Sequence, residues 1–387
     1  MTTRQLTAQD EAELYALARY AFNLPSTPNR DQAFQSLYDH SAAFGTGEPL
    51  DSGFLSTKFD VNFHGTTYAM RGIGYVASYP EASGKGSIGQ LMTAAFDEMQ
   101  QHKVTVSYLA PFSSTFYRRF GYEDAFTMTT HTIAARDFPR IAKSPATVVR
   151  TPFADAIPAM SAIYANQSAT KKGGVIREDW WWDNIRVHRP QYEVALAYLN
   201  DAVSGYIIYS RNYPTLTVHE SFANDVASLR ALWRFIGAHQ TAFEDFSIQT
   251  ADPELQYDFV PEARHLKTTI APYMMARIVD VADFLNRYPY QIDALAPVIL
   301  EITDDNIVAN NGKWQLAIAD GQGQMARVSD ETPSDIQLRQ EQLVQASFGV
   351  RSLQQLAALE RVSGEASAIA QLSAAFKHER SQLYDYF

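Results

Sequence analysis

The feature that most constrains this chain is a short loop, rich in glycine and serine, between an apolar strand and an amphipathic helix. The strand pattern ends near Tyr79, and the loop runs through Gly84, Lys85 and Gly86. The helix is indicated by apolar residues at helical spacing, namely Ile88, Leu91, Met92, Ala95, Phe96 and Met99. The first N–H groups of a helix lack partners within it, and the helix dipole favours an anion there. Because glycine lets the backbone approach a ligand closely, the sequence predicts a phosphate or pyrophosphate site at this loop.

Two nucleotide ligands fit this loop poorly. Residues 84–89 read G-K-G-S-I-G and match the G-x-G-x-x-G pattern of dinucleotide sites. The dinucleotide-binding fold also needs an acidic residue at the end of the next strand, where Ser107 and Tyr108 stand instead. A nucleoside-triphosphate loop needs G-x-x-x-x-G-K-[ST], and no such string occurs in the chain.

The third ligand is coenzyme A, which the Gcn5-related N-acetyltransferases (GNATs) bind on a similar loop. Their [QR]-x-x-G-x-[GA] frame falls on residues 83–88, keeps Gly86, and departs from the pattern at Ser83 and Ile88. An ordinary strand-to-helix turn without a ligand is the remaining interpretation of the loop taken alone.

A second motif follows at the spacing that GNAT domains show. Residues 116–122 read F-Y-R-R-F-G-Y and fit F-Y-x-x-x-G-[FY], an element beside the acetyl-CoA cleft of GNATs. This resemblance implies that Tyr117 lies near the thioester sulfur and protonates the departing thiolate. A phenol suits that role, because its ordinary pKa is about 10 and that of a thiol is about 8.5. A purely packed aromatic is the alternative for Tyr117. For Arg118 and Arg119 a solvated surface position is favoured, although either side chain can reach a CoA phosphate.

Over its whole length the chain resembles the enhanced-intracellular-survival (Eis) type of acetyltransferase. The resemblance rests on the block from Arg71 to Glu81, the block from Phe116 to Glu123, the length of 387 residues and the terminal Phe387. It implies an α+β (mixed α/β) fold of tandem GNAT-like domains followed by a sterol-carrier-protein-like α+β domain. The expected domains are residues 1–140 with the acetyl-CoA site, 141–276 without a cofactor loop, and 277–387.

The same resemblance implies the ligands and the site residues. Acetyl-CoA is expected as the acetyl donor. Separately, the nine histidines are scattered and form no H-E-x-x-H, so no metal is expected. Tyr117 is expected to act as the acid, and the terminal carboxylate of Phe387 as the base. Substrate contacts are expected from Phe22, Tyr75 and Tyr386. The expected cofactor-binding residues are Val76, Ala77, Ser78, Ser83, Gly84, Lys85, Gly86, Ser87, Ile88, Gly89 and Ser113.

Periodicity and turn residues outline the rest of the chain. Thr127 to Ala134 is expected as the last strand of the first domain, and Ser334 to Gln345 as a helix in the third. The run from Trp180 to Trp182 has two interpretations. We favour a helix that buries two of the three indoles at a domain junction over an aromatic platform for a substrate. The apolar tail from Tyr384 to Phe387 is expected to bury its rings and to carry the terminal carboxylate into the protein.

Composition excludes several classes of function. The net charge of −11 disfavours a nucleic-acid partner, and the absence of cysteine removes disulfides, thiolate metal sites and a cysteine nucleophile. No apolar run is long enough to span a membrane and no signal peptide is visible, so a soluble, cytoplasmic protein without a membrane partner is expected. The resemblance implies a homo-oligomer, usually a hexamer.

The expected reaction is direct acetyl transfer from acetyl-CoA to a primary amine, which is a small amine, a polyamine, an aminoglycoside-like compound or a lysine side chain. The alternatives are a non-catalytic binding or assembly protein on the GNAT fold, and a lipid carrier that acts through the third domain. Aminoglycoside-acetylating relatives place an acidic residue just before the chain end, where Tyr386 stands here, so aminoglycosides are in doubt.

Overall fold

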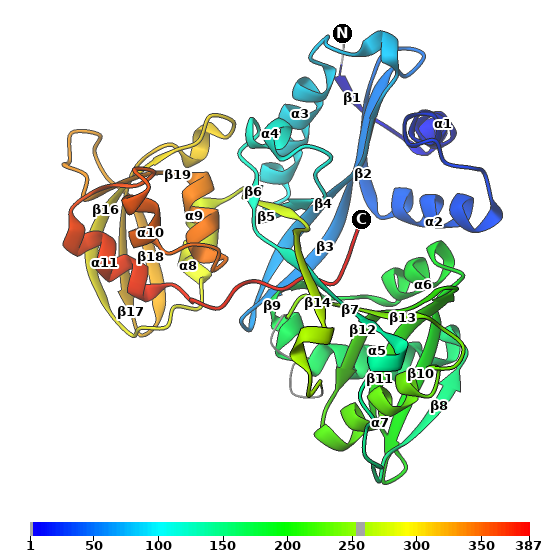
Figure 1. Cartoon of the computed structure of the whole chain (residues 1–387). Helices are drawn as coiled ribbons and strands as arrows, with labels where there is room; N and C mark the ends of the chain where they lie inside the picture. Colours follow the sequence, from blue (N-terminus) through cyan, green and yellow to red (C-terminus); the bar gives the residue numbers. More distant parts are fainter. Residues whose placement is uncertain (1–2, 253–259) are drawn as a thin grey trace.

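The computed structural model describes residues 3–252 and 260–387, which form three β-sheets with helices packed on them (Figure 1). The sheets have eight, seven and five strands. The mixed α+β class expected from the sequence is therefore confirmed, and each sheet marks one unit of the fold.

The first unit contains the Gly-rich loop. Its sheet runs in the order β1-β2-β3-β4-β5-β15-β6, with β9 paired to β3. The strands are β1 (Thr3–Gln5), β2 (Ser41–Thr46), β3 (Ser52–Phe63), β4 (Thr66–Ser78), β5 (Val106–Leu109), β6 (Glu123–Asp124), β9 (Lys172–Val175) and β15 (Met275–Ile278). The helices are α1 (Glu11–Phe22), α2 (Pro28–Asp39), α3 (Ser87–Gln101) and α4 (Ser114–Arg118). On α3 the predicted apolar face is buried from Leu91 to Met99, whereas Ile88 lines a cavity.

The second unit is a seven-stranded sheet in the order β14-β7-β13-β12-β11-β10-β8. Its strands are β7 (Thr127–Ala134), β8 (Thr147–Thr151), β10 (Glu193–Leu199), β11 (Ala202–Asn212), β12 (Thr215–Ala223), β13 (Asp245–Thr250) and β14 (Lys267–Pro272). Its helices are α5 (Phe153–Asn166), α6 (Asp179–His188) and α7 (Val226–Gly237).

The first two units exchange strands, which the sequence did not reveal. Thr127–Ala134 is a strand, but it pairs with β13 and β14 of the second sheet, so its placement in the first domain was wrong. In the opposite direction, β15 inserts between β5 and β6 of the first sheet. A boundary near residue 140 or 276 therefore does not separate the two sheets, and the units are joined through their backbones.

The third unit is a five-stranded sheet in the order β18-β17-β16-β19-β20. Its strands are β16 (Leu295–Thr303), β17 (Gly312–Ala319), β18 (Gln322–Arg327), β19 (Ile336–Arg339) and β20 (Ser363–Gly364), and its helices are α8 (Val281–Arg287), α9 (Gln340–Ser347), α10 (Leu353–Ala358) and α11 (Ala366–Ala375). The helix expected over Ser334 to Gln345 is wrong in its first half, because Ile336–Arg339 pairs in parallel with β16 and buries Ile336 and Leu338.

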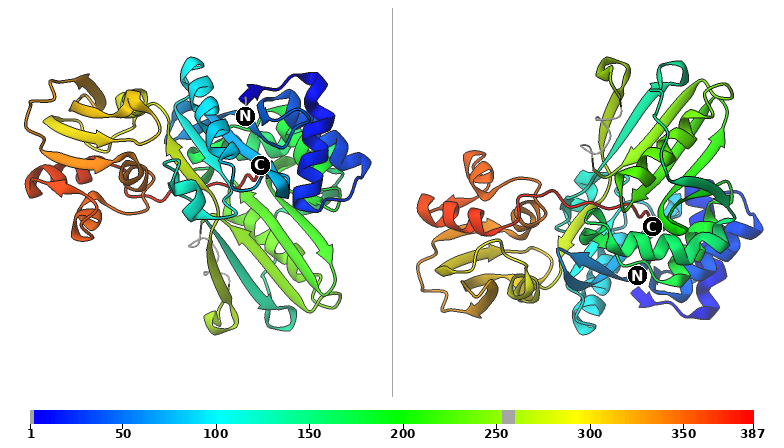
Figure 2. Two further views of the ribbon diagram at one scale, coloured as in Figure 1. Left: turned by 90° about the horizontal axis from the view of Figure 1, so that it is seen from above. Right: turned by 90° about the horizontal axis from the view of Figure 1, so that it is seen from below.

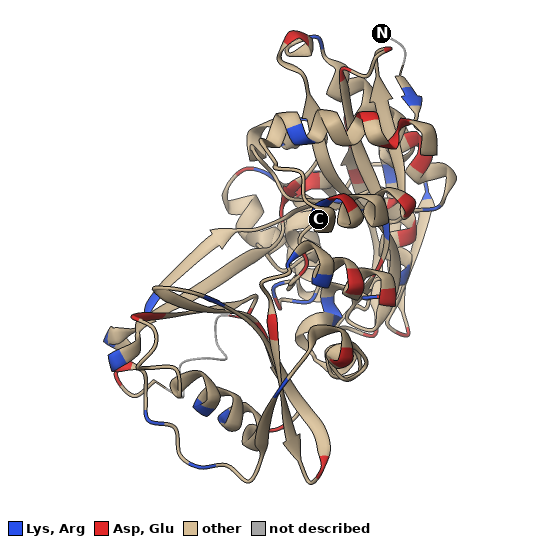
Figure 3. Cartoon of the chain, turned by 90° about the vertical axis from the view of Figure 1, so that its right-hand side faces the viewer, with Lys and Arg blue, Asp and Glu red and all other residues tan. Residues whose placement is uncertain are grey.

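The last residues leave the third unit and return to the first. After α11 the chain runs without regular structure past the second unit and ends at β3 and β4, as the red segment of Figures 1 and 2 shows. Acidic and basic positions are interspersed over the ribbons in Figure 3. Within the described ranges, no helix combines the length and the apolar character needed to cross a bilayer.

Candidate active site

The Gly-rich loop ends in an open helix N-terminus. Gly84 and Gly86 have φ angles of 77° and 78°, which lie in the left-handed region that glycine adopts without strain. A Cβ atom added to either residue would meet no protein atom within 4 Å, so the space in front of the loop is open. Gly86 is the N-cap of α3, no side chain caps this helix, and its first turn has no acidic residue. The N–H groups of the first turn therefore face a place suited to an anion.

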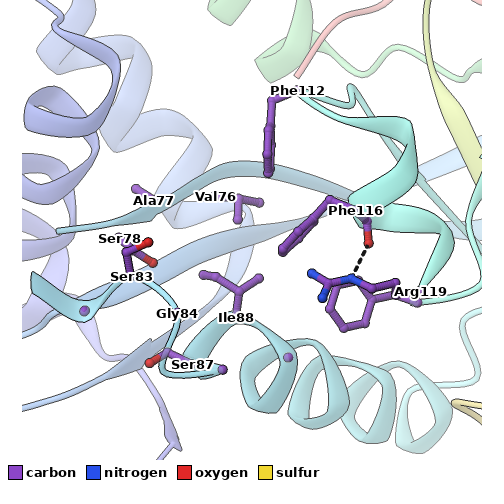
Figure 4. A pocket seen from close by; sticks show the side chains of 14 residues that line it. Val76, Ala77, Ser78, Ser83, Gly84, Ser87, Ile88, Phe112, Phe116 and Arg119 are labelled. Carbon is purple, nitrogen blue, oxygen red and sulfur yellow. Dashed lines mark hydrogen bonds between the residues drawn. The ribbon is translucent and has the colours of Figure 1, made fainter. Parts of the chain in front are cut away.

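A cavity of 510 Å3 lies in front of this helix end. It is bounded by the end of β4, the Gly-rich loop, α3 and α4, and Val76, Ile88 and Phe116 point into it (Figure 4). Arg119 also lines it, with its guanidinium over the Phe116 ring at 4.5 Å and without an ion pair among the described residues. An arginine without an ion pair beside an open helix N-terminus suits a ligand with several phosphates.

The sheet itself opens at this cavity. β4 and β5 run in parallel and pair only as far as Ile73 and Leu109, whereas β4 continues to Ser78. Against β3, the strand β4 carries an extra residue between Gly74 and Ala77, and Tyr75 there has a φ of 54°. Such a bulge leaves backbone groups unpaired in the ladder and redirects the strand. Beyond Ile73, the edge of β4 that faced β5 therefore has no strand partner among the described residues, and Val76 to Ser78 line the cavity there.

Tyr117 lies on α4, in the same buried cluster as Ile73 and Leu109, where the pairing of β4 with β5 ends. Its side chain is 2% exposed, and burial raises the pKa of its phenol, so the hydroxyl is protonated at neutral pH. The following turn is held from two sides, because Arg277 of β15 in the first sheet donates to the carbonyl of Phe120, and Gln340 of α9 in the third unit donates to the carbonyl of Gly121. Arg277 is itself fixed by a buried ion pair with Asp304, at 2.5 Å and 2.7 Å. The third unit thereby supports the segment that positions Tyr117.

The end of the chain reaches the same place. Phe387 is 9% exposed, and its ring lies 5.1 Å from the Phe59 ring, centroid to centroid. A Cβ atom added to Gly74 of β4 would lie 3.0 Å from the carboxylate carbon of Phe387, and one on Gly72 would lie 2.5 Å from its ring. These two glycines of the Arg71 to Glu81 block make room for the chain end. The tail does not bury all of its rings, however, because Tyr386 is 59% exposed and Tyr384 is half-buried.

A buried ion cluster anchors this tail. Asp385 accepts hydrogen bonds from Arg177 Nε and Trp181 Nε1, both at 2.7 Å, and from the Tyr164 hydroxyl at 3.1 Å. Arg177 also donates to both oxygens of Glu220, at 3.0 Å and 2.6 Å. The cluster ties the chain end to the second unit two residues before the terminal carboxylate.

A second cavity, of 460 Å3, meets the first one at Val76 and Phe112, which line both. Tyr117 and Phe387 line this second cavity, as do Phe22, Tyr75 and Tyr386, the three residues expected to contact the substrate. The other lining residues are Tyr15, Leu24, Arg30, Leu37, Ile73, Gly74, Ala110, Pro111, Trp181, Asn184, His188 and Arg189. We call the first space the cofactor cavity and the second the acceptor cavity.

The structure brings most of the predicted cofactor residues together. Val76 to Ser78, Ser83, Gly84 and Gly86 to Gly89 line the cofactor cavity, whereas Lys85 and Ser113 are not among its lining residues. The Ser113 hydroxyl instead caps α4 by accepting from the Phe116 N–H group at 3.3 Å.

Sequence reasoning did not select Ala82, Phe112, Phe116 and Phe120 as lining residues, and it favoured the surface for Arg119, which lines the cavity. Arg118 pairs with Glu123 at 2.8 Å and with Asp124 at 2.5 Å. The aromatic residues from Phe112 to Phe120 are evident in the sequence, but their spacing does not show which of them line a cavity and which pack in the core.

Comparison with known proteins assigns the units to families. Residues 2–125 and residues 173–278 each match an acetyltransferase (GNAT) domain, and residues 281–384 match a sterol carrier protein domain. The match from 173 to 278 includes β15, the strand that the second segment of chain lends to the first sheet. No curated protein matches the sequence.

Solved structures resemble the chain over its full length. A probable N-acyltransferase from Enterococcus faecalis V583, described as a conserved protein of unknown function, is 33% identical with a TM-score of 0.95, and the alignment covers 100% of this chain and 99% of that one. A GCN5-related N-acetyltransferase from Anabaena variabilis is 19% identical with a TM-score of 0.89, covering 100% of both chains. Eis1 from Mycobacterium abscessus is 19% identical with a TM-score of 0.80, also covering 100% of both chains. With two acetyltransferase domains, a sterol carrier protein domain and a full-length relative at 33% identity, the chain belongs to the GNAT family of acetyltransferases and has the Eis-like domain arrangement.

Proposed function

We propose that the protein transfers an acetyl group from acetyl-CoA directly to a primary amine at the meeting point of the two cavities. The observation that carries this proposal is the convergence of Tyr117 and the Phe387 carboxylate on one cavity that adjoins a second, anion-binding one. The family match supports acetyl-CoA as the donor. The pyrophosphate of the donor is assigned to the N–H groups from Gly84 to Gly89, and Arg119 to one of its phosphates.

Each group then has a chemical task. When bound, acetyl-CoA supplies a thioester whose carbonyl carbon is attacked. The terminal carboxylate of Phe387 takes the first proton that the ammonium must lose, and the neutral amine attacks. The new N–C bond forms, the C–S bond breaks, and Tyr117 protonates the leaving thiolate. The second proton of the amine, which is released as the amide forms, restores the Tyr117 hydroxyl. Backbone N–H groups at the end of β4 are assigned to the carbonyl oxygen as it gains negative charge. Much of the rate comes from holding the two reactants together.

One detail of the structure bears on Tyr117. Burial raises its pKa, which makes the phenol a weaker acid than the free side chain, and the Tyr386 phenol adds to this effect. The match to a thiol of pKa about 8.5 is therefore less close than the reference values suggest. The same shift keeps the phenol fully protonated before the reaction, so every bound donor meets a hydroxyl that can donate.

The alternative functions gain less support. A lipid carrier would need an apolar space in the third unit, but the cavity of 320 Å3 described there is lined partly by Arg351, Lys377 and His378. A non-catalytic binding protein would have no use for a buried chain end placed beside Tyr117 and the cofactor cavity.

We also propose a homo-oligomer, with six copies as the expected number, on the basis of resemblance to the Eis type. Light scattering at micromolar concentration tests this directly. A mass near the 43.3 kDa of one chain would contradict it.

The activity is tested by supplying acetyl-CoA with a panel of primary amines and measuring released CoA with a thiol reagent. The chain contains no cysteine, so the reagent reports CoA alone. We expect CoA release that requires both substrates, and an N-acetylated product by mass spectrometry. CoA release without acetylated amine, or none with any amine, would overturn the proposal.

A further inference from the structure

The acceptor cavity has a charge pattern that narrows the choice of amine. Resting on the proposed function, we propose that the acceptor carries an anionic group, a carboxylate or a phosphate, in addition to its amine, and that Arg30 and Arg189 bind this group. This class differs from polyamines and aminoglycosides, whose remaining groups are cationic or neutral.

The two arginines come from separate elements and meet at this cavity. Arg30 lies on α2, Arg189 follows the last residue of α6, and both line the cavity and are half-buried. Across residues 3–252 and 260–387, neither side chain makes an ion pair or a hydrogen bond. By contrast, Arg186 on the same helix pairs with Asp183 at 2.7 Å. Partly burying an unpaired guanidinium costs free energy, and a planar anion recovers it through paired N–H donors.

Both arginines influence the pKa values of two side chains that line the cavity. Burial lowers the pKa of His188 to about 4, with Arg189 and then Arg30 adding to the effect, so this imidazole is neutral at pH 7. Burial raises the pKa of Tyr75, while the same two arginines oppose the shift. The positive charge of the two side chains is thus directed at the space that the acceptor enters.

No acidic side chain balances this charge within the cavity. None of the described lining residues is Asp or Glu, and the terminal carboxylate of Phe387, which the reaction uses as the base, is the one negative group assigned there. A second ammonium on the acceptor would face two guanidinium groups and be repelled. The overall charge of −11 is therefore a poor guide to the substrate.

Two acids lie in an adjoining cavity of 160 Å3, which Arg189 and His188 also line. Glu220 and Asp385 are the acids, and both are already held by Arg177. Glu220 accepts a further hydrogen bond from the Tyr206 hydroxyl at 2.6 Å. Neither acid forms an ion pair with Arg189, so this guanidinium keeps its donors for a ligand.

The rest of the lining describes the body of the acceptor. The same cavity has apolar walls, which include Phe22, Leu24, Ile73, Phe112 and Trp181. An amine linked to its anion by an apolar body fits this arrangement, with the amine at Phe387 and the anion at the arginines.

The test uses linear acceptors with a primary amine at one end, a polymethylene chain of fixed length, and a variable group at the far end. That group is a carboxylate, a phosphate monoester, a methyl or an ammonium, and the four members are compared at several chain lengths. Both kcat/KM and the Kd from calorimetry with CoA present are measured. We expect the carboxylate or the phosphate member to exceed the methyl member by about tenfold, as one charged hydrogen bond in a half-exposed site provides, and the diamine to be the poorest. The better of the two anionic members identifies the source of the anion.

Charge-removing variants locate the effect. In Arg30→Gln and Arg189→Gln the preference for the anionic over the methyl member should fall by about tenfold, whereas Arg186→Gln, the control on the same helix, should keep it. The inference is overturned if the methyl or ammonium member binds as well as the anionic ones, or if both variants keep the wild-type preference. If no amine is acetylated but the anionic members still bind through the two arginines, the proposed function fails and the anion site stands.

Discussion

The anchoring of the chain end to the second unit gives the sharpest stability prediction. In Asp385→Asn the side chain keeps its shape but loses its charge, so Arg177 keeps only Glu220 as an ionic partner. The amide also places an NH2 group where one of the two carboxylate oxygens accepted; Arg177 and Trp181 donate to one of these oxygens and Tyr164 to the other. We expect the tail to detach more often while the three sheets remain folded.

The size of the effect follows from the burial of the pair. The side chains of Arg177 and Asp385 are 2% and 0% exposed, and a hydrogen bond to a charged group contributes about 1.5–3 kcal/mol; because Arg177 keeps Glu220, we take this range as the cost. Over this range of about 1.5–3 kcal/mol, the detached fraction rises about 10- to 150-fold, because about 1.36 kcal/mol corresponds to a tenfold change. The terminal Phe387 then leaves β4 in the same proportion.

Carboxypeptidase digestion followed by mass spectrometry measures this detachment. When opening is fast relative to cleavage, the release of Phe387 follows the detached fraction. Glu379→Gln is the control, since it removes an ion pair of the same tail with Lys172, at 2.7 Å, in which the Glu379 side chain is 61% exposed and which contributes about 1 kcal/mol at most. Equal rates of release from the two variants would refute the assignment of the anchor to Asp385.

Three further predictions concern the chemistry and the pH dependence. Tyr117→Phe should keep acetyl-CoA affinity and lose about 10²- to 10⁴-fold in turnover, and full activity would assign this residue to packing alone. Deleting Phe387, or adding glycines after it, should lower turnover but leave acetyl-CoA binding in place; wild-type rates in both variants would remove the carboxylate from the mechanism. Burial lowers the pKa of His64 to about 4, so the unfolded chain binds more protons between about pH 6.5 and 4, and stability falls as the pH falls through that window. His64→Asn, which suits the φ of 51° before Gly65, should reduce the loss of melting temperature between about pH 7.5 and 5, and an unchanged loss would show that other groups cause it.

Local patterns predicted the secondary structure around the cofactor cavity well. The Gly-rich loop and the apolar face of α3 both depend on neighbouring residues, and they lie where the sequence placed them. The motif around Tyr117 also forms the helix and turn that the sequence predicted, because its spacing is set within one short segment.

Partners distant in sequence could not be predicted in this way. Alternation of apolar residues identifies Thr127–Ala134 as a strand but does not say which sheet it joins, because that choice depends on contacts with β13 and β14. Ile336 and Leu338 fit a strand and a helix face equally well over so few residues, and pairing with β16 decides in favour of the strand.

The acceptor side of the site shows the same limit. Arg30 and Arg189 belong to no motif and are separated by more than a third of the chain, so only the packing of α2 against α6 brings them to one cavity. A lone arginine in a sequence is usually a surface residue. The sequence likewise expected Tyr386 to be buried, whereas it is largely exposed at the edge of the acceptor cavity.

The central claim, that acetyl-CoA occupies the cavity in front of α3, is tested most directly by calorimetric titration of acetyl-CoA into the wild-type protein and Gly86→Glu. The added side chain would meet no protein atom near its Cβ, so it extends into the space assigned to the pyrophosphate and brings a like charge there. Gly84→Glu serves as a second variant, because it has the same φ strain and the same open space. We predict one acetyl-CoA per chain in the wild type and no measurable binding in Gly86→Glu, which still unfolds cooperatively but at a lower melting temperature because of the φ strain. Unchanged affinity in a folded Gly86→Glu protein would contradict the account.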